Sequence, residues 1–166
     1  RAVRPHLRSI GLKVGVVSIK LLQPFPDAEL VEALRNAKNV TILERSEDTA
    51  LTKFVTQALY RGGIHPRLTT AIFGLGGHDV QPRHLVAAAK HMASDDAAEL
   101  VYLGSQFFIE HPTPAIAAIQ DRLRAAYPET ELMALPTQAN PAVLPDEALR
   151  IRFHSVGGYG TIATGK

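Results

Sequence analysis

The hydrophobic pattern of residues 13–48 predicts the unit around which the chain is organised. Lys13–Leu22 is apolar at nearly every position and rich in β-branched residues, which is typical of a strand buried on both faces of a sheet. Two prolines then end the strand, and Asp27 can cap a helix whose apolar residues share one face. A second apolar run follows at residues 40–43. We therefore expect a βαβ crossover with two parallel strands.

The rest of the chain continues this alternation of helical and strand patterns. Apolar residues at spacings of three and four predict helices, and short apolar runs between turn residues predict strands. The expected elements are a short amphipathic helix over residues 1–10, helices over 51–60, 82–93 and 115–127, strands over 68–73, 99–103 and 149–153, and a possible short strand over 132–135. For the helix over 115–127, a docking role is the alternative, but we expect its apolar side to face the core and its outer face, with Arg122 and Arg124, to face solvent. The predicted fold is α/β, an open, mostly parallel sheet with flanking helices in a Rossmann-like three-layer arrangement.

Composition divides the chain into four parts. Residues 1–10 have the character of the tail of a preceding helix or linker, 11–127 form the α/β domain, and 128–148 are a proline-rich connector. Residues 149–166 contain a strand, a glycine-rich turn and one turn of helix, which is the start of a second α/β unit. Such a unit cannot bury itself alone. We therefore expect the 166 residues to be a piece of a longer protein.

Charge and composition exclude several classes of function. The chain has 18 basic and 16 acidic residues, a net charge of +2, and no basic block that would follow a phosphate backbone. No apolar run approaches the about 20 residues that span a bilayer. The absence of cysteine excludes disulfides, thiolate nucleophiles and cysteine-ligated iron–sulfur clusters in this stretch. We expect a cytoplasmic protein that binds neither nucleic acid nor membranes.

The glycine-rich turn near the end of the chain is the best candidate for a ligand-binding site. Gly157, Gly158 and Gly160 lie between a predicted strand and a predicted helix, where backbone amides can hold a phosphate group. With Ala163, the turn formally satisfies the dinucleotide pattern G-x-G-x-x-A. A plain tight turn explains the same residues. The pattern thus leaves open a second function, a stand-alone Rossmann-like nucleotide-binding module that uses the turn 157–163.

A second glycine-rich turn and three histidines are weaker candidates. The turn 74–77 lacks a glycine at position 79, so we expect only a tight strand-to-helix connection. His84 and His91 are seven residues apart on one helix, and His78 lies in the loop before it. That spacing is too long for a shared metal ion without a third element. We expect solvated histidines and no metal site.

Hydroxyl and carboxylate groups do not combine into a catalytic set. Ser105 resembles half of a nucleophile elbow, but the second glycine of G-x-S-x-G is absent. The acidic run 44–48 follows a predicted parallel strand, at the edge where open α/β sheets bind ligands. A solvated loop, or an acidic surface that faces a neighbouring domain, explains this run equally well. We therefore expect no catalytic residue in this chain.

Three motifs identify a family resemblance: Gly11–Val17, the LQPFP sequence of residues 22–26, and the TILER sequence of residues 41–45. They resemble the transketolase C-terminal-like domain of thiamine-diphosphate enzymes, and more narrowly that of the pyruvate:ferredoxin/flavodoxin oxidoreductase (2-oxoacid:acceptor oxidoreductase) family. Residues 152–160 are similar to the start of the family's gamma domain. The family usually continues R-(T/S)-K-E-x-G, whereas this chain has RSEDTA at residues 45–50, which indicates a divergent branch.

The resemblance implies a role inside a larger enzyme. The parent would oxidatively decarboxylate a 2-oxoacid of the pyruvate type to an acyl-CoA, with thiamine diphosphate, magnesium and iron–sulfur clusters as cofactors and coenzyme A as substrate. Ferredoxin or flavodoxin would accept the electrons, and the parent would be a homo-oligomer. This chain would be a non-catalytic structural or interface domain that holds no cofactor and contacts the other domains or subunits.

Overall fold

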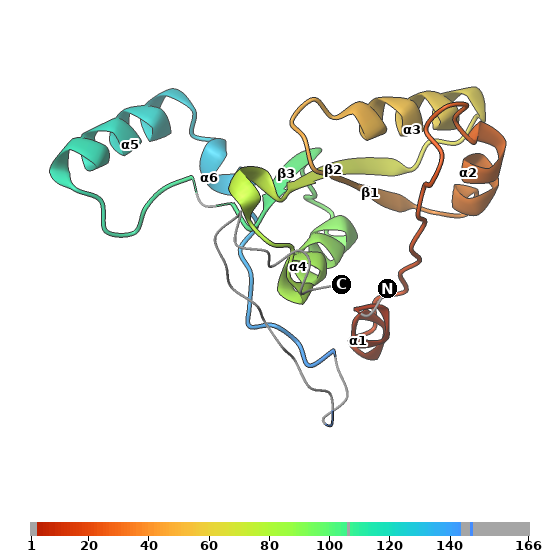
Figure 1. Cartoon of the computed structure of the whole chain (residues 1–166), viewed down its shortest axis with the longest axis horizontal. Coiled ribbons are helices and arrows are strands. Elements are labelled where there is room, and N and C mark those ends of the chain that lie inside the picture. The colour runs from red at the N-terminus through yellow and green to blue at the C-terminus, as the bar shows by residue number, and fades with distance from the viewer. Residues whose placement is uncertain (1–2, 106, 144–146, 148–166) are drawn as a thin grey trace, which may run out of the picture.

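The computed structural model describes residues 3–105, 107–143 and 147, which form an α/β fold around a parallel sheet (Figure 1). The helices are α1 (Arg4–Ser9), α2 (Asp27–Leu34), α3 (Ala50–Arg61), the 3-10 turn η1 (Leu75–Gly77), α4 (Pro82–Ala93), α5 (Pro114–Ala126) and α6 (Thr130–Met133), and the strands are β1 (Asn39–Glu44), β2 (Arg67–Phe73) and β3 (Leu100–Leu103). The predicted α/β class is confirmed, and these helices and strands overlap most of the expected ones.

The described part of the sheet has three parallel strands in the order β1-β2-β3. Ile42 of β1 lies beside Thr70 of β2, and Ala71 of β2 lies beside Val101 of β3. The short strand expected over 132–135 is instead the helix α6 followed by one parallel bridge between Tyr102 and Ala134. The chain therefore returns to the sheet beside β3 without adding a full strand.

Helices cover both faces of the sheet. Helices α2 and α3 lie on one face, where Ile42 packs in a buried cluster with Leu30, Val55 and Leu59 (Figure 1). Helix α4 lies on the opposite face, where Ala88 packs with residues of β2 and β3 in a second cluster. The three-layer arrangement thus follows from strands whose alternate side chains point to opposite faces.

The strand predicted over Lys13–Leu22 is wrong. In the described structure these residues form an extended segment that runs from α1 to α2 without joining the sheet (Figure 1). Val16 is 57% exposed and Leu22 is 55% exposed. Within the segment, Ile19 packs against the α2–α3 cluster, and Val14 packs against a cluster of α1 and α4 residues. Residues 13–48 therefore form an extended segment, a helix and a strand in place of a βαβ unit. An apolar run indicates that its side chains need to be buried, but it does not show which surface covers them.

The predicted cap at Asp27 is wrong, and longer-range contacts hold the starts of both α2 and α3. Asp27 is the first residue of α2, and its carboxylate pairs with Arg61 of α3 at 3.2 Å. Thr49 precedes α3 with a φ of 50° and makes no side-chain capping bond in the described structure. Glu44, 6% exposed at the end of β1, instead accepts a hydrogen bond of 2.6 Å from the backbone N–H of Thr52. The negative carboxylate lies at the helix N-terminus, where the helix dipole favours it.

The last predicted elements lie outside the described residues. These are the strand over 149–153 and the turn and helix that follow it. The division into 1–10, 11–127, 128–148 and 149–166 therefore stays a prediction, although α1 does lie within the first of these parts. Within the described ranges, none of the helices has the length and apolar character needed to cross a membrane.

Candidate functional site

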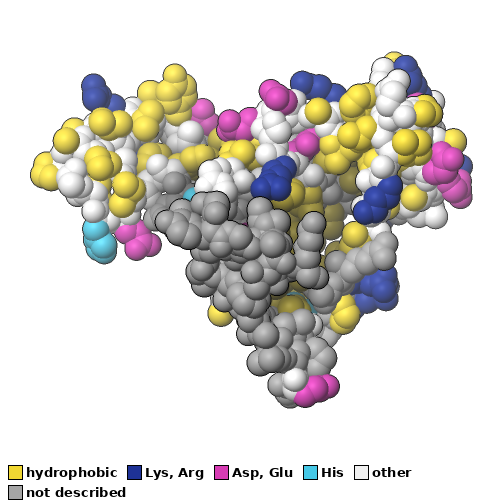
Figure 2. All heavy atoms as spheres, in the orientation of Figure 1, with side chains coloured by type: hydrophobic (Ala, Val, Ile, Leu, Met, Phe, Trp, Pro, Cys, Tyr) yellow, Lys and Arg dark blue, Asp and Glu magenta, His cyan; other side chains and the backbone are white. Residues whose placement is uncertain are grey.

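Helix α5 carries an apolar side that the sheet does not cover. Figure 1 shows α5 standing away from the sheet, connected to it by the loop after β3 and by α6. Ile116, Ile119 and Leu123 follow one another at helical spacing, and each is exposed, Ile119 by 48%. The prediction that this side faces the core is wrong. We call these three residues and Tyr127 the arm face, and residues 107–133 the arm; hydrophobic side chains are spread over the arm in Figure 2.

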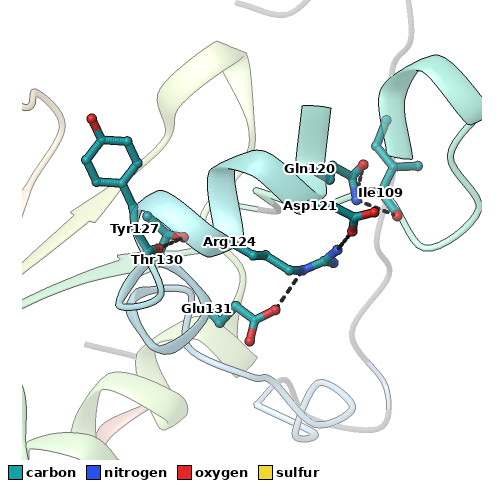
Figure 3. Close-up of polar contacts among 7 residues, drawn as sticks. All are labelled: Ile109, Gln120, Asp121, Arg124, Tyr127, Thr130 and Glu131. Carbon is teal, nitrogen blue, oxygen red and sulfur yellow. Dashed lines mark hydrogen bonds and ion pairs between the residues drawn. The ribbon is translucent and has the colours of Figure 1, made fainter. Parts of the chain in front are cut away.

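Specific polar contacts hold the arm in shape (Figure 3). Gln120 is only 5% exposed; its Oε1 accepts a hydrogen bond of 3.2 Å from the Ile109 N–H, and its Nε2 donates one of 3.3 Å to the Ile109 carbonyl. Arg124 pairs with Asp121 at 3.3 Å and with Glu131 of α6 at 2.7 Å. A buried amide bonded twice to the loop fixes α5 against the preceding chain. The arm face is therefore presented by an internally bonded unit.

The segment 12–22 is a second uncovered apolar surface. Its exposed hydrophobic residues are Val16, Val17, Leu21 and Leu22. Exposed apolar patches on folded domains mark protein–protein contacts when they are larger than scattered single side chains. Both surfaces come from stretches whose sequences predict burial, so the arm face and the segment 12–22 are the candidate interface of this chain.

The acidic run 44–48 is bonded within the domain. Glu44 is buried at the N-terminus of α3, as described above. Glu47 accepts a hydrogen bond of 3.0 Å from the Tyr102 hydroxyl of β3. Burial of Tyr102, together with Glu47, raises the pKa of this hydroxyl. The run thus supports the sheet edge through Glu44 and Glu47.

His84 differs from the solvated histidine that the sequence predicts. The residue is only 4% exposed, and its Nδ1 accepts a hydrogen bond of 3.1 Å from the Gln81 backbone N–H at the start of α4. Burial, and the nearby charge of Arg83, lower the pKa of His84 below its ordinary value. Gln81 and His84 form a reciprocal capping box at the start of α4, but Gln-x-x-His is not the usual sequence signature, so the sequence contains no signal for the buried histidine.

The other histidines have separate surroundings. Nε2 of His91 accepts a hydrogen bond of 2.9 Å from the Ala98 N–H, and His78 is exposed. Across the described ranges, no group of three His, Asp or Glu side chains is arranged to hold a metal ion.

The remaining candidates have plain structural surroundings. Gly74 and Gly76 adopt left-handed conformations, φ 71° and 62°, which confirms that 74–77 is a tight connection. Ser105 is half-buried after β3, and no hydrogen bond joins it to a histidine or carboxylate among the described residues. Arg122 is exposed on α5. The turn of Gly157, Gly158 and Gly160 lies outside the described residues, so its ligand contact stays a prediction.

Comparison with known proteins identifies a family and several relatives of this chain. The pyruvate:ferredoxin oxidoreductase core domain II matches residues 1–85. The chain is 36% identical over 105 residues to pyruvate synthase subunit PorA of Thermotoga maritima, which covers 60% of this chain and 27% of that subunit. It is also 36% identical over 90 residues to ketoisovalerate oxidoreductase subunit VorA of Pyrococcus furiosus, which covers 52% of this chain and 23% of the relative.

A longer relative also matches about half of this chain. Pyruvate-flavodoxin oxidoreductase of Enterobacter agglomerans is 25% identical over 96 residues, 54% of this chain and 8% of that protein. The matched stretch thus spans at most about a quarter of the length of these relatives. None of these three supports the alternative of a stand-alone nucleotide-binding module. Because the family domain covers just over half of the chain, and because the α/β fold agrees with it, this protein belongs to the pyruvate:ferredoxin oxidoreductase core domain II family.

Proposed function

We propose that this chain is a structural and interface domain of a 2-oxoacid:ferredoxin or 2-oxoacid:flavodoxin oxidoreductase. The observation that carries the proposal is the arm face, an apolar helix side that is exposed on an internally bonded unit. Family membership supports the parent activity, because the relatives are named as oxidoreductases or synthase subunits for pyruvate and ketoisovalerate. Both names specify 2-oxoacids, so we propose that class for the parent.

The arm face can contribute a useful part of a docking energy. Fully burying a Leu or Ile side chain stabilises by about 1.5–3 kcal/mol. Since Ile116, Ile119 and Leu123 are already about half covered, we expect about 1 kcal/mol from each on docking. The sum, about 3 kcal/mol, is small beside the free-energy cost of joining two independent proteins, which is about 4–15 kcal/mol. It suits a domain that is attached to, or assembled with, the rest of a large enzyme.

The iron–sulfur clusters of the parent do not fit this chain. The sequence contains no cysteine, so it offers no thiolate ligand for an iron–sulfur cluster. We propose that thiamine diphosphate, magnesium and the clusters are bound by other domains, where the 2-oxoacid, coenzyme A and ferredoxin or flavodoxin also react. In this proposal the parent is a cytoplasmic homo-oligomer, and the 166-residue chain alone has no thiamine-dependent turnover.

Substitutions on the arm face test the interface role. Ile119→Asp, made in the assembled oxidoreductase, should weaken association of this domain with its neighbours by at least about tenfold, because docking would then bury an unpaired charge. It should leave the unfolding free energy of the isolated 166-residue chain nearly unchanged, since Ile119 faces solvent there. The matched control is Tyr60→Asp, a change at an exposed aromatic residue on α3. Assembly is measured by light scattering after gel filtration, and protection of α5 by hydrogen exchange.

The pair of variants decides whether the arm face is an interface. Loss of assembly with Ile119→Asp and normal assembly with Tyr60→Asp supports the proposal. Equal assembly of wild type and Ile119→Asp, with α5 unprotected in the complex, refutes it. Measurable 2-oxoacid decarboxylation by the isolated chain would show that the domain is catalytic, contrary to the proposal.

A further inference from the structure

A cavity of about 510 Å³ opens at the carboxyl ends of β2 and β3, apart from the arm face. The start of α4 supplies Arg83 and His84 to its lining, the loop after β3 supplies Gly104 and Phe107, and Leu135 after α6 closes another side. Open parallel sheets commonly bind ligands at this edge, and the volume lies in the range of small-molecule sites. The proposed interface does not use this cavity.

His84, a largely buried residue, lines the cavity and offers it a hydrogen-bond donor. A backbone N–H can only donate, so the bond from Gln81 leaves Nδ1 of His84 without a proton. The proton of the neutral ring is then on Nε2, and burial favours the neutral ring. Among the described residues, no hydrogen bond is found for Nε2. This ring edge lies against Gly104, where a Cβ would be 3.1 Å from Nε2.

Arg83 brings a positive charge to the same wall. Its Nε is buried and has no hydrogen-bond partner within the described ranges, and no salt bridge to Arg83 occurs there. The acidic residues around the cavity are Asp79 and Glu110, both exposed, and Glu131, which already pairs with Arg124. A hydrogen-bond donor on His84 and an Arg83 guanidinium without a salt bridge in the described ranges, together on one wall, favour an anionic group.

We propose that this cavity binds a small organic anion whose oxyanion group, a carboxylate or a phosphate, accepts hydrogen bonds from His84 Nε2 and the Arg83 guanidinium. Its apolar body would contact Phe107 and Leu135. The cavity is lined by residues of this chain and not by the arm face, so its ligand binding can be measured without assembly. Failure of the anion site would leave the interface role intact, and failure of the interface would leave the anion site intact.

Binding of simple aryl anions to the 166-residue chain tests the proposal. The probes are phenyl phosphate and benzoate, with benzyl alcohol as a neutral compound of similar shape. Ligands of this size that make two charge-assisted contacts should bind with a dissociation constant of about 1 mM. Titration is followed by the NMR signals of the His84 imidazole nitrogens. Arg83→Gln and His84→Gln should each weaken binding by about tenfold or more, since a hydrogen bond to a charged group is lost.

Arg122→Gln is the matched control, because it removes the same charge from an exposed position on α5 away from the cavity. Binding of either anion that depends on Arg83 and not on Arg122 supports the proposal, and the tighter anion identifies the head group. Arg83→Gln decides this even if the buried His84→Gln variant does not fold. Three results would overturn the proposal. Benzyl alcohol could bind as tightly as the anions, or the Arg83 and Arg122 variants could lose equal affinity for them. The His84 signals could also stay unchanged at an anion concentration of about 20 mM, 20 times the expected dissociation constant.

Discussion

Gly62, the residue that ends α3, lies against Val31 of α2. This contact determines whether Gly62→Ala raises or lowers the unfolding free energy of the chain. A Cβ placed on Gly62 would lie 2.7 Å from Cγ1 of Val31 and 3.1 Å from its Cβ, and it would also overlap Cγ2. The backbone of Gly62 has φ −79° and ψ −3°, which alanine adopts without strain. Without Val31, Gly62→Ala would therefore stabilise the chain by about 0.4–1 kcal/mol, because alanine restricts the unfolded state.

The contact reverses this gain. Forcing an additional carbon into a packed site costs about 1–3 kcal/mol. Rotation of the β-branched Val31 side chain to another staggered rotamer leaves at least one γ carbon in one of the two positions that meet the new atom. We expect Gly62→Ala to lower the unfolding free energy by about 1–2 kcal/mol in the wild-type chain. In a Val31→Ala background, where both γ carbons are gone, the same change should be neutral or stabilising.

Urea denaturation of the four chains of this double-mutant cycle measures the coupling, which should be about 1–3 kcal/mol. Gly63→Ala serves as the control. Gly63 has a φ of 67° and nothing within 4 Å of its Cβ position, so its cost comes from backbone strain and should be equal in both backgrounds. If Gly62→Ala costs the same in the wild-type chain as in the Val31→Ala background, the packing argument for the α2–α3 contact is wrong.

Three further substitutions test the contacts that organise the sheet and its helices. Glu44→Ala should destabilise the chain by about 1–2 kcal/mol through loss of the bond to the Thr52 N–H, and Glu44→Gln, which keeps an acceptor, should restore part of that loss in urea denaturation. The pKa of His84 is lowered in the native state, so the native chain binds fewer protons at this residue than the unfolded chain does. The contribution of His84 to the unfolding free energy should therefore be fully present above the ordinary pKa of 6.5 and fall as the pH drops toward the native pKa. His84→Gln should flatten this part of the profile of unfolding free energy against pH. Arg67 donates to the carbonyls of Met92, Ser94 and Asp95 at the end of α4, so Arg67→Met should cost about 1–3 kcal/mol, and an unchanged denaturation midpoint would contradict this role.

Local sequence patterns were sufficient for most of the helices and strands. Apolar spacing predicted α3 and α4. Short β-branched runs predicted β1 and β2. These features depend on residues within one turn or one strand, so a single sequence contains them. The motifs at 22–26 and 41–45 likewise identified the family that the comparisons confirm.

Contacts between distant residues could not be derived from such patterns. The sequence shows that Lys13–Leu22 and the face of α5 are apolar, but only the tertiary structure decides whether the domain itself covers them. The buried position of His84 depends on Gly104, twenty residues away, whose missing side chain leaves room for the ring. The cap of α3 comes from Glu44 at the end of a strand, in place of the adjacent Thr49.

The chain by itself thus determined its local elements, its family and the surfaces that require burial. The tertiary structure decided which of those surfaces the domain buries and which it leaves for a neighbour. The physical reason is that hydrophobic periodicity shows which face of an element is apolar and is stabilised by burial. Whether that face is buried depends on a second surface that only folding brings into contact with it.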